Sequence, residues 1–189
     1  MVRGKRARNR PRVYTGVVPR YDIPKAAPQP LALVQGFVNT ADFEHDKDWL
    51  DAWLAEQGMH DAAPAELERA REVREAIREL LYVNNRQRSA GDPHAVLRRA
   101  ADAAELTLDL QRPELAPRAP GVDGALGRVL AVAFTAMTNG TWPRLKACRN
   151  HGCRWAFYDY SRNRSASWCS MQLCGNRTKT RAYRQRHAA

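Results

Sequence analysis

Four cysteines stand close together near the end of the chain, and their spacing predicts a metal site. Cys148 and Cys153 enclose four residues, as do Cys169 and Cys174, and fifteen residues separate the two pairs. Each short loop lets two thiolates converge on one cation, and two such pairs complete a tetrahedral shell. Four soft sulfur ligands favour one zinc ion. An iron–sulfur centre, another thiophilic metal, two disulfides or four unrelated thiols are the alternatives.

A shell of four cysteine sulfurs leaves no open position for water or substrate, so this zinc is predicted to be structural. His151 lies between the first two cysteines and could replace one ligand, but we expect it on the surface of the loop. Residues 31–140 contain no nucleophile–base set, no phosphate-cradling glycine loop and no paired-histidine metal motif. We therefore expect a protein that is not an enzyme.

The residues after Cys174 are rich in arginine and predict a basic helix. At about 100° per residue, Arg177, Arg181 and Arg184 fall on one stripe, and Lys179 falls on the opposite side with Arg186. Three residues between these stripes are expected to face the rest of the cysteine-rich module: Asn176, Thr180 and Tyr183. An ordinary solvated helix is the alternative to a helix that binds nucleic acid.

Arginine suits nucleic acid because its planar fork donates two hydrogen bonds to a phosphate or to guanine. Arg149 and Arg154 are further candidates on the first cysteine loop. The aromatic residues from Trp155 to Trp168 could stack on unpaired bases, but we expect them to form the core around the zinc. The predicted nucleic-acid contacts are Arg162, Arg164, Arg177, Lys179, Arg181 and Arg184.

The stretch WCSMQLCGNRTKTRAYRQRH, preceded by SRNRS, resembles the CGNR zinc-finger family, whose name stands here as Cys174, Gly175, Asn176 and Arg177. Members of this family pair the finger with an upstream helical domain, the ABATE domain. The resemblance implies a bacterial, stress-linked transcription regulator. The segment LALVQGFVNT (Leu31–Thr40) looks like the opening of the ABATE domain. Ala166 and Ser167 stand where the family has basic residues, so no phosphate contact is expected there.

The net charge of +11 over 189 residues is unevenly distributed. Residues 1–30 carry eight Lys/Arg against one acid, residues 141–189 carry eleven against one, and residues 31–140 carry twelve against eighteen. Such a distribution predicts a neutral-to-acidic body with two basic appendages that suit a polyanion. The sequence contains neither an 18-residue apolar run nor a secretory signal. Reduced, metal-binding cysteines then favour the cytoplasm.

The body is predicted to be helical, because apolar residues recur at helical spacing. We expect helices over 31–40, from Trp49 to Gly58, over 65–90 after Pro64, over 93–104 capped by Asp92, and over 124–138 capped by Asp123. Leu106–Gln111 alternates like a short strand, with 114–116 as its hairpin partner, and 154–160 predicts another strand. The expected buried face of the last body helix is Leu126, Val129, Leu130, Ala133, Phe134 and Met137.

The sequence therefore predicts a mainly α protein in three parts. These are a basic disordered arm (1–30), a helical ABATE-like domain with a short β-hairpin (31–140), and a treble-clef-like or ribbon-like zinc module that ends in a basic helix (141–189). The predicted function is a zinc-finger transcription regulator that binds double-stranded DNA, with a helical domain that regulates or forms homodimers. A zinc-dependent protein-interaction or RNA-associated module is the alternative. The target sequence and any small-molecule effector are not predicted.

Overall fold

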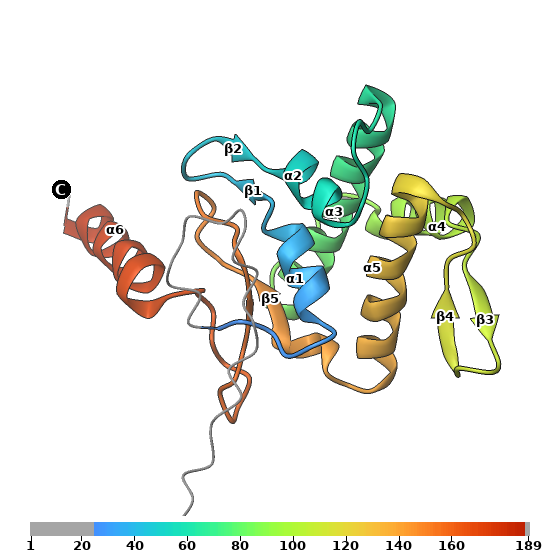
Figure 1. The fold of residues 1–189 in the computed structure, drawn as a ribbon. Coiled ribbons are helices and arrows are strands. Elements are labelled where there is room, and N and C mark those ends of the chain that lie inside the picture. Colours follow the sequence, from blue (N-terminus) through green and yellow to red (C-terminus); the bar gives the residue numbers. More distant parts are fainter. Residues whose placement is uncertain (1–24, 188–189) are drawn as a thin grey trace, which may run out of the picture.

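The computed structural model describes residues 25–187, apart from the side chains of Ala182 and Arg186. It is mostly helical, as the sequence predicts (Figure 1). The helices are α1 (Ala32–Val38), α2 (Leu50–Glu56), α3 (Pro64–Asn84), α4 (Pro93–Ala103), α5 (Gly121–Thr138) and α6 (Asn176–His187), with a 3-10 turn η1 (Trp142–Arg144) and a π-helical turn η2 (Met171–Gly175). No helix in the described part of the chain is both long and apolar enough to cross a membrane.

Three small antiparallel strand pairs join the helices. The predicted hairpin partner of Leu106–Gln111 is confirmed, since β3 (Thr107–Asp109) pairs with β4 (Glu114–Ala116). The pair projects from the body, so Leu108 and Leu110 are exposed (Figure 1). The other two pairs are β1 (Ala41–Asp42) with β2 (Lys47–Asp48), and β5 (Leu145–Ala147) with β6 (Ala156–Tyr158).

Helix ends follow local chemistry at some positions and tertiary contacts at others. The Asp92 side chain accepts a hydrogen bond from the Ala95 amide and Pro93 opens α4, as predicted. Two boundaries were wrong: α3 ends at Asn84 and not near residue 90, and α5 begins at Gly121 and not after an Asp123 cap. Helix α3 ends because Arg86 adopts a left-handed φ of 59° and the Gln87 amide donates back to the Tyr82 carbonyl. The Asn85 side chain turns toward the cysteine-rich module at this point.

The core of the body lies between α1, α3 and α5, with α2 packed over one end (Figure 1). Its fully buried side chains include Phe37, Ile77, Leu126 and Val129. Two residues predicted to be buried are not, because Phe134 is 52% exposed and Met137 is 41% exposed. Together with Leu80 of α3 and Leu97 of α4, they line an open apolar hollow that these helices leave uncovered.

The β5–β6 hairpin joins the body to the cysteine-rich module because its two faces belong to different cores. Leu145, Ala147, Ala156 and Tyr158 pack into the core of the body. Phe157 and the adjacent Trp155 point to the opposite side and pack with the cysteines. This is the period-2 alternation of a strand that is covered on both faces. The hairpin therefore fixes the orientation of the cysteine-rich module relative to the helices.

Of the six described residues of the predicted N-terminal arm, Lys25 to Ala27 pack against the protein, and the exposed residues 28–30 lead into α1. The backbone carbonyl of Lys25 accepts a hydrogen bond from the Tyr158 amide at 2.9 Å, and that of Ala26 accepts one from the Tyr160 hydroxyl at 2.6 Å. Ala27 is buried, and its amide donates to the Gln35 side chain. Residues 1–24, which hold most of the predicted basic arm, lie outside the described residues.

Candidate metal centre and basic groove

The first cysteine pair lies on the loop that connects β5 to β6. The Cys148 amide donates to the Trp155 carbonyl at 2.9 Å, which closes the loop at its base. Within the loop, the Asn150 carbonyl accepts hydrogen bonds from the amides of Cys153 and Arg154. Arg154 adopts a positive φ of 53°, a conformation that turns the chain sharply back into β6. Both thiols consequently point to the same side of the hairpin and are buried.

The second cysteine pair lies where the chain enters the C-terminal helix. The Ser170 hydroxyl accepts a hydrogen bond from the Leu173 amide and starts the helical turn. Cys174 is the fourth residue of that turn, and its amide donates to the Ser170 carbonyl. One cysteine pair on the loop of a β-hairpin, followed by a second pair at the start of a helix, is the arrangement of a treble-clef-like module. A ribbon would place the second pair on another hairpin.

The four thiols form one buried cluster whose geometry fits zinc. All four sulfur atoms lie within 4.8 Å of one another. The Cys153–Cys169 and Cys169–Cys174 sulfur pairs are each 3.7 Å apart, and none of the four cysteines is in a disulfide. A tetrahedron with zinc–sulfur bonds of about 2.3 Å has edges of about 3.8 Å. The cluster therefore matches the ligand shell of one structural zinc ion, as the sequence predicts.

Hydrogen bonds among the four thiols favour two thiolates over four, because hydrogen bonding to the Cys148 thiol lowers the pKa of Cys153 and that of Cys174. Hydrogen bonding to the Cys153 and Cys174 thiols, together with burial, raises the pKa of Cys148. Hydrogen bonding to the Cys148 and Cys153 thiols, again with burial, raises the pKa of Cys169. A divalent cation at the centre of the cluster compensates the negative charge that these buried thiols would otherwise avoid.

Asn150 is a residue of the site that the sequence did not reveal. Its side-chain amide donates to the Cys174 sulfur at 3.5 Å, which joins the first loop to the helix start. Such a hydrogen bond stabilises a thiolate ligand. Asn176, which the sequence places on the helix face toward the module, is exposed. His151 is also exposed and stands outside the cysteine cluster, as expected.

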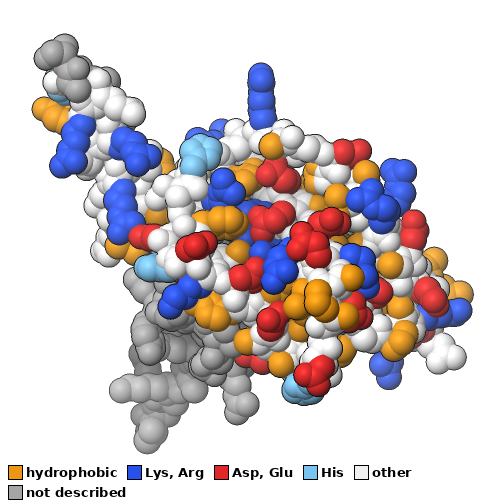
Figure 2. All heavy atoms as spheres, turned by 90° about the horizontal axis from the view of Figure 1, so that it is seen from above, with side chains coloured by type: hydrophobic (Ala, Val, Ile, Leu, Met, Phe, Trp, Pro, Cys, Tyr) orange, Lys and Arg blue, Asp and Glu red, His pale blue; other side chains and the backbone are white. Residues whose placement is uncertain are grey.

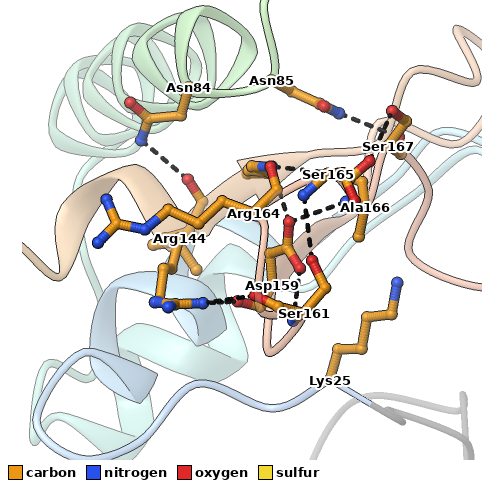
Figure 3. Close-up of polar contacts among 12 residues, drawn as sticks. Lys25, Asn84, Asn85, Arg144, Asp159, Ser161, Arg164, Ser165, Ala166 and Ser167 are labelled. Carbon is orange, nitrogen blue, oxygen red and sulfur yellow. Dashed lines mark hydrogen bonds and ion pairs between the residues drawn. The ribbon is translucent and has the colours of Figure 1, made fainter.

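A buried ion pair supports the loop before the second cysteine pair. Lys146 Nζ lies 2.8 Å from Asp159 Oδ2 and also donates to the carbonyls of Arg164 and Ala166. Asp159 accepts further hydrogen bonds from the amides of Ser161 and Ala166 (Figure 3). Burial alone would raise the Asp159 pKa, but the Lys146 and Ser161 hydrogen bonds lower it to about 2. Asp159 therefore stays ionised and holds the loop in place.

The end of α3 contacts both cysteine loops. The Asn85 side-chain amide donates to the Ala147 carbonyl at 2.7 Å and to the Ser167 carbonyl at 3.0 Å. Ala147 directly precedes Cys148, and Ser167 stands two residues before Cys169. Arg149 in turn donates twice to the Asn85 carbonyl. Figure 3 shows Asn85 reaching from α3 toward Ser167, whereas the neighbouring Asn84 donates to the carbonyls of Trp142 and Leu145 before the first loop.

Helix α6 projects away from the body, and its cationic side chains are presented to solvent (Figures 1 and 2). The described cationic residues Arg177, Lys179, Arg181 and Arg184 are exposed. Asn176, Thr180 and Tyr183, which were expected to face the rest of the module, are all exposed, but Asn176 and Thr180 do line the hollow between α6 and the first cysteine loop. The helix continues directly from η2, and the Thr178 hydroxyl donates to the Cys174 carbonyl one turn back along the chain.

A groove of about 790 Å³ separates α6 from the first cysteine loop. Arg177, Arg181 and Arg184 line it from α6, and Arg149 lines it from the loop. The predicted stripe of three arginines thus faces one groove, and Lys179 is not among the lining residues. Arg162 and Arg164 are exposed on the loop after β6 and also lie outside the groove lining. All six remain predicted nucleic-acid contacts.

Comparison with protein families assigns both parts of the chain. A family model described as "CGNR zinc finger" matches residues 144–187. A second family model, ABATE, described as "Putative stress-induced transcription regulator", matches residues 31–140. No curated protein matched the chain.

Proposed function

Because the chain belongs to the ABATE family of stress-induced transcription regulators and carries a CGNR zinc finger, we propose that it binds double-stranded DNA through the groove beside α6. The observation that carries the proposal is the set of four arginines that line this groove next to the zinc centre. The guanidinium group of arginine binds phosphate or guanine through two hydrogen bonds at once. The zinc fixes the start of α6, so it fixes where these arginines stand relative to the first cysteine loop.

Duplex DNA suits the module better than unpaired bases do. Three aromatic side chains that could have stacked on bases, Trp155, Phe157 and Tyr158, are buried in the two cores that the β5–β6 hairpin separates. Tyr160 is exposed but lies outside the groove lining. A single-stranded site needs exposed aromatic platforms. Apart from the Glu44 carboxylate, the charged side chains that line the groove are arginines, which match a phosphate backbone.

The test is the salt dependence of affinity for a labelled mixed-sequence duplex, measured by fluorescence anisotropy. Replacing Arg177, Arg181 and Arg184 by Ala removes three cations from the groove. If each contacts one phosphate, the slope of log K against log salt falls in magnitude by about 2.7. A control that replaces Arg98, Arg99 and Arg112 removes the same charge from exposed positions of the body and leaves the slope unchanged. Equal slopes for the groove variant and the unaltered protein reject the proposal.

The alternative function is a zinc-dependent protein-interaction or RNA-associated module. Partners captured from a lysate by the full chain separate the two functions. Under our proposal, DNase treatment releases the captured material. Under the alternative, capture survives DNase, or is lost only with RNase.

Three further assignments belong to the same proposal. The protein acts as a homodimer, because a single finger contacts few base pairs; sedimentation with and without duplex measures this. It works in the bacterial cytoplasm, where thiols stay reduced. It is not an enzyme, because four sulfurs close the zinc shell and the metal has a structural role.

A further inference from the structure

Glu44 stands in the groove where a phosphate would be expected. It is the only acidic residue among the described residues that line the groove, and it comes from the turn between β1 and β2. Its carboxylate forms an ion pair and a hydrogen bond with the Arg177 guanidinium. The Glu44 side chain is 25% exposed and the Arg177 side chain is 57% exposed, so solvent and solutes reach this ion pair.

The turn that carries Glu44 is held in place by the body and by the first cysteine loop. The buried Asp42 carboxylate accepts hydrogen bonds from the amides of Glu44 and His45. The Phe43 ring packs against two guanidinium groups, at 4.9 Å from Arg78 and 4.7 Å from Arg154. Because Phe43 and Asp42 are both anchored, the position of the next residue, Glu44, is fixed relative to the groove.

Carboxylate and phosphate oxygens compete for the same guanidinium fork. Arg181 and Arg184 follow Arg177 on the groove side of α6, at about 6 and 10 Å along the helix axis. A phosphodiester chain can therefore engage Arg181 and Arg184 while it approaches Arg177. Resting on the proposed function, we propose that the Arg177 position is a backbone-phosphate site, and that Glu44 occupies this site in the free protein as an internal competitor.

This competition would make the groove selective and would connect it to the ABATE domain. A single small anion must displace Glu44 with one contact, whereas a polyanion gains the Arg181 and Arg184 contacts as well. The β1–β2 turn is tied to α3, since Arg74 binds Asp48 at 2.7 Å and the Thr40 hydroxyl at 3.0 Å. A change in the helical body that withdraws the turn therefore frees Arg177 for the phosphate and strengthens binding.

The experiment measures duplex affinity at low salt for the zinc-loaded full chain and three variants: Glu44→Gln, Arg177→Ala and the double variant. Glu44→Gln keeps the side-chain shape and removes the charge. We expect it to tighten binding about two- to fivefold, the range that corresponds to an exposed ion pair. In the Arg177→Ala background the same change should have no effect, because the group that Glu44 blocks is absent.

Asp46→Asn is the matched control, since Asp46 lies in the same turn but does not line the groove. Its positive φ of 51° also suits asparagine. If Asp46→Asn and Glu44→Gln tighten duplex binding equally, the gain in affinity comes from the loss of any negative charge in the turn, and the inference is overturned. Unchanged affinity for Glu44→Gln would overturn it too. If Glu44→Gln is silent while the triple arginine variant still lowers the salt slope, the proposed function stands and only the internal competitor is rejected.

Discussion

At the scale of single residues, the zinc ligands can be identified from the sequence, whereas the side chains around them are identified only in the structure. The four cysteines are recognisable from spacing alone, and the structure brings their sulfur atoms within 4.8 Å of one another. Asn150, which donates to the Cys174 sulfur, lies between two ligands and has no pattern that marks it. Glu44 is even less recognisable, because it pairs with a residue 133 positions away.

Replacing a zinc ligand should release the metal, whereas replacing the neighbouring histidine should not. We expect Cys174→Ser to reduce zinc from one ion per chain to a small fraction, because a neutral hydroxyl is a poor substitute for a thiolate. His151→Ala is the control and should retain one zinc, since His151 is exposed outside the cluster. Metal analysis after dialysis against a weak chelator measures both. Zinc lost from His151→Ala and kept by Cys174→Ser would contradict the four-sulfur assignment.

At the scale of elements, the end of α3 and the β5–β6 hairpin position the metal centre. The sequence predicts a helix at α3, but its apolar periodicity does not indicate what the C-terminal end of the helix contacts. Asn85 ends the helix and holds one carbonyl from each cysteine loop. The hairpin places alternate residues in two cores. The metal centre is thus supported by the body and is more than a module attached by a linker.

Asn85→Asp should destabilise the protein and accelerate zinc release. The substitution preserves shape, but the carboxylate cannot donate, so the Ala147 and Ser167 carbonyls lose their partner. With about 1–3 kcal/mol for each unsatisfied buried group, we expect a loss of about 2–5 kcal/mol in the free energy of unfolding. Urea unfolding followed by tryptophan fluorescence measures the loss, and transfer of zinc to a chelator measures the release.

Asn163→Asp is the matched control for this change, because Asn163 is exposed on the loop after β6. It introduces the same charge into the same module and should shift the free energy of unfolding by less than about 0.5 kcal/mol. If the two variants behave alike, Asn85 is not a structural clamp for the cysteine loops.

At the scale of the whole molecule, the two family matches meet inside one structural unit. The ABATE match ends at residue 140 and the finger match begins at 144. Yet Leu145, Ala147, Ala156 and Tyr158 belong to the core of the helical body. The Asn39 side chain also binds both the amide and the carbonyl of Ala156. The finger is therefore built on the body, which gives the β1–β2 turn a fixed position beside α6.

We expect the fragment 141–189 to remain without fixed structure even with one equivalent of zinc. On its own it would expose the apolar hairpin face that the body covers, and it has little other core to replace it. Dispersion of amide signals in an NMR spectrum measures folding of the fragment, with the zinc-loaded full chain as reference. A well-dispersed spectrum from the zinc-loaded fragment would show that the finger folds independently of the body.

The sequence by itself determined the metal, its four ligands, the mainly helical class and the stripe formed by Arg177, Arg181 and Arg184. These features depend on spacing over a few residues, and local geometry turns such spacing directly into shared faces and shared ligands. Local signals also located α4 through Asp92-Pro93 and the β3–β4 hairpin through alternation.

Only the tertiary structure decided which distant residues complete the site. The contacts of Asn85 with the cysteine loops and of Glu44 with Arg177 join segments that are 62 to 133 residues apart. The exposure of Phe134 and Met137, and of Tyr183 on α6, likewise depends on what the neighbouring elements fail to cover. Periodicity defines a face of a helix, but packing decides whether another element buries it.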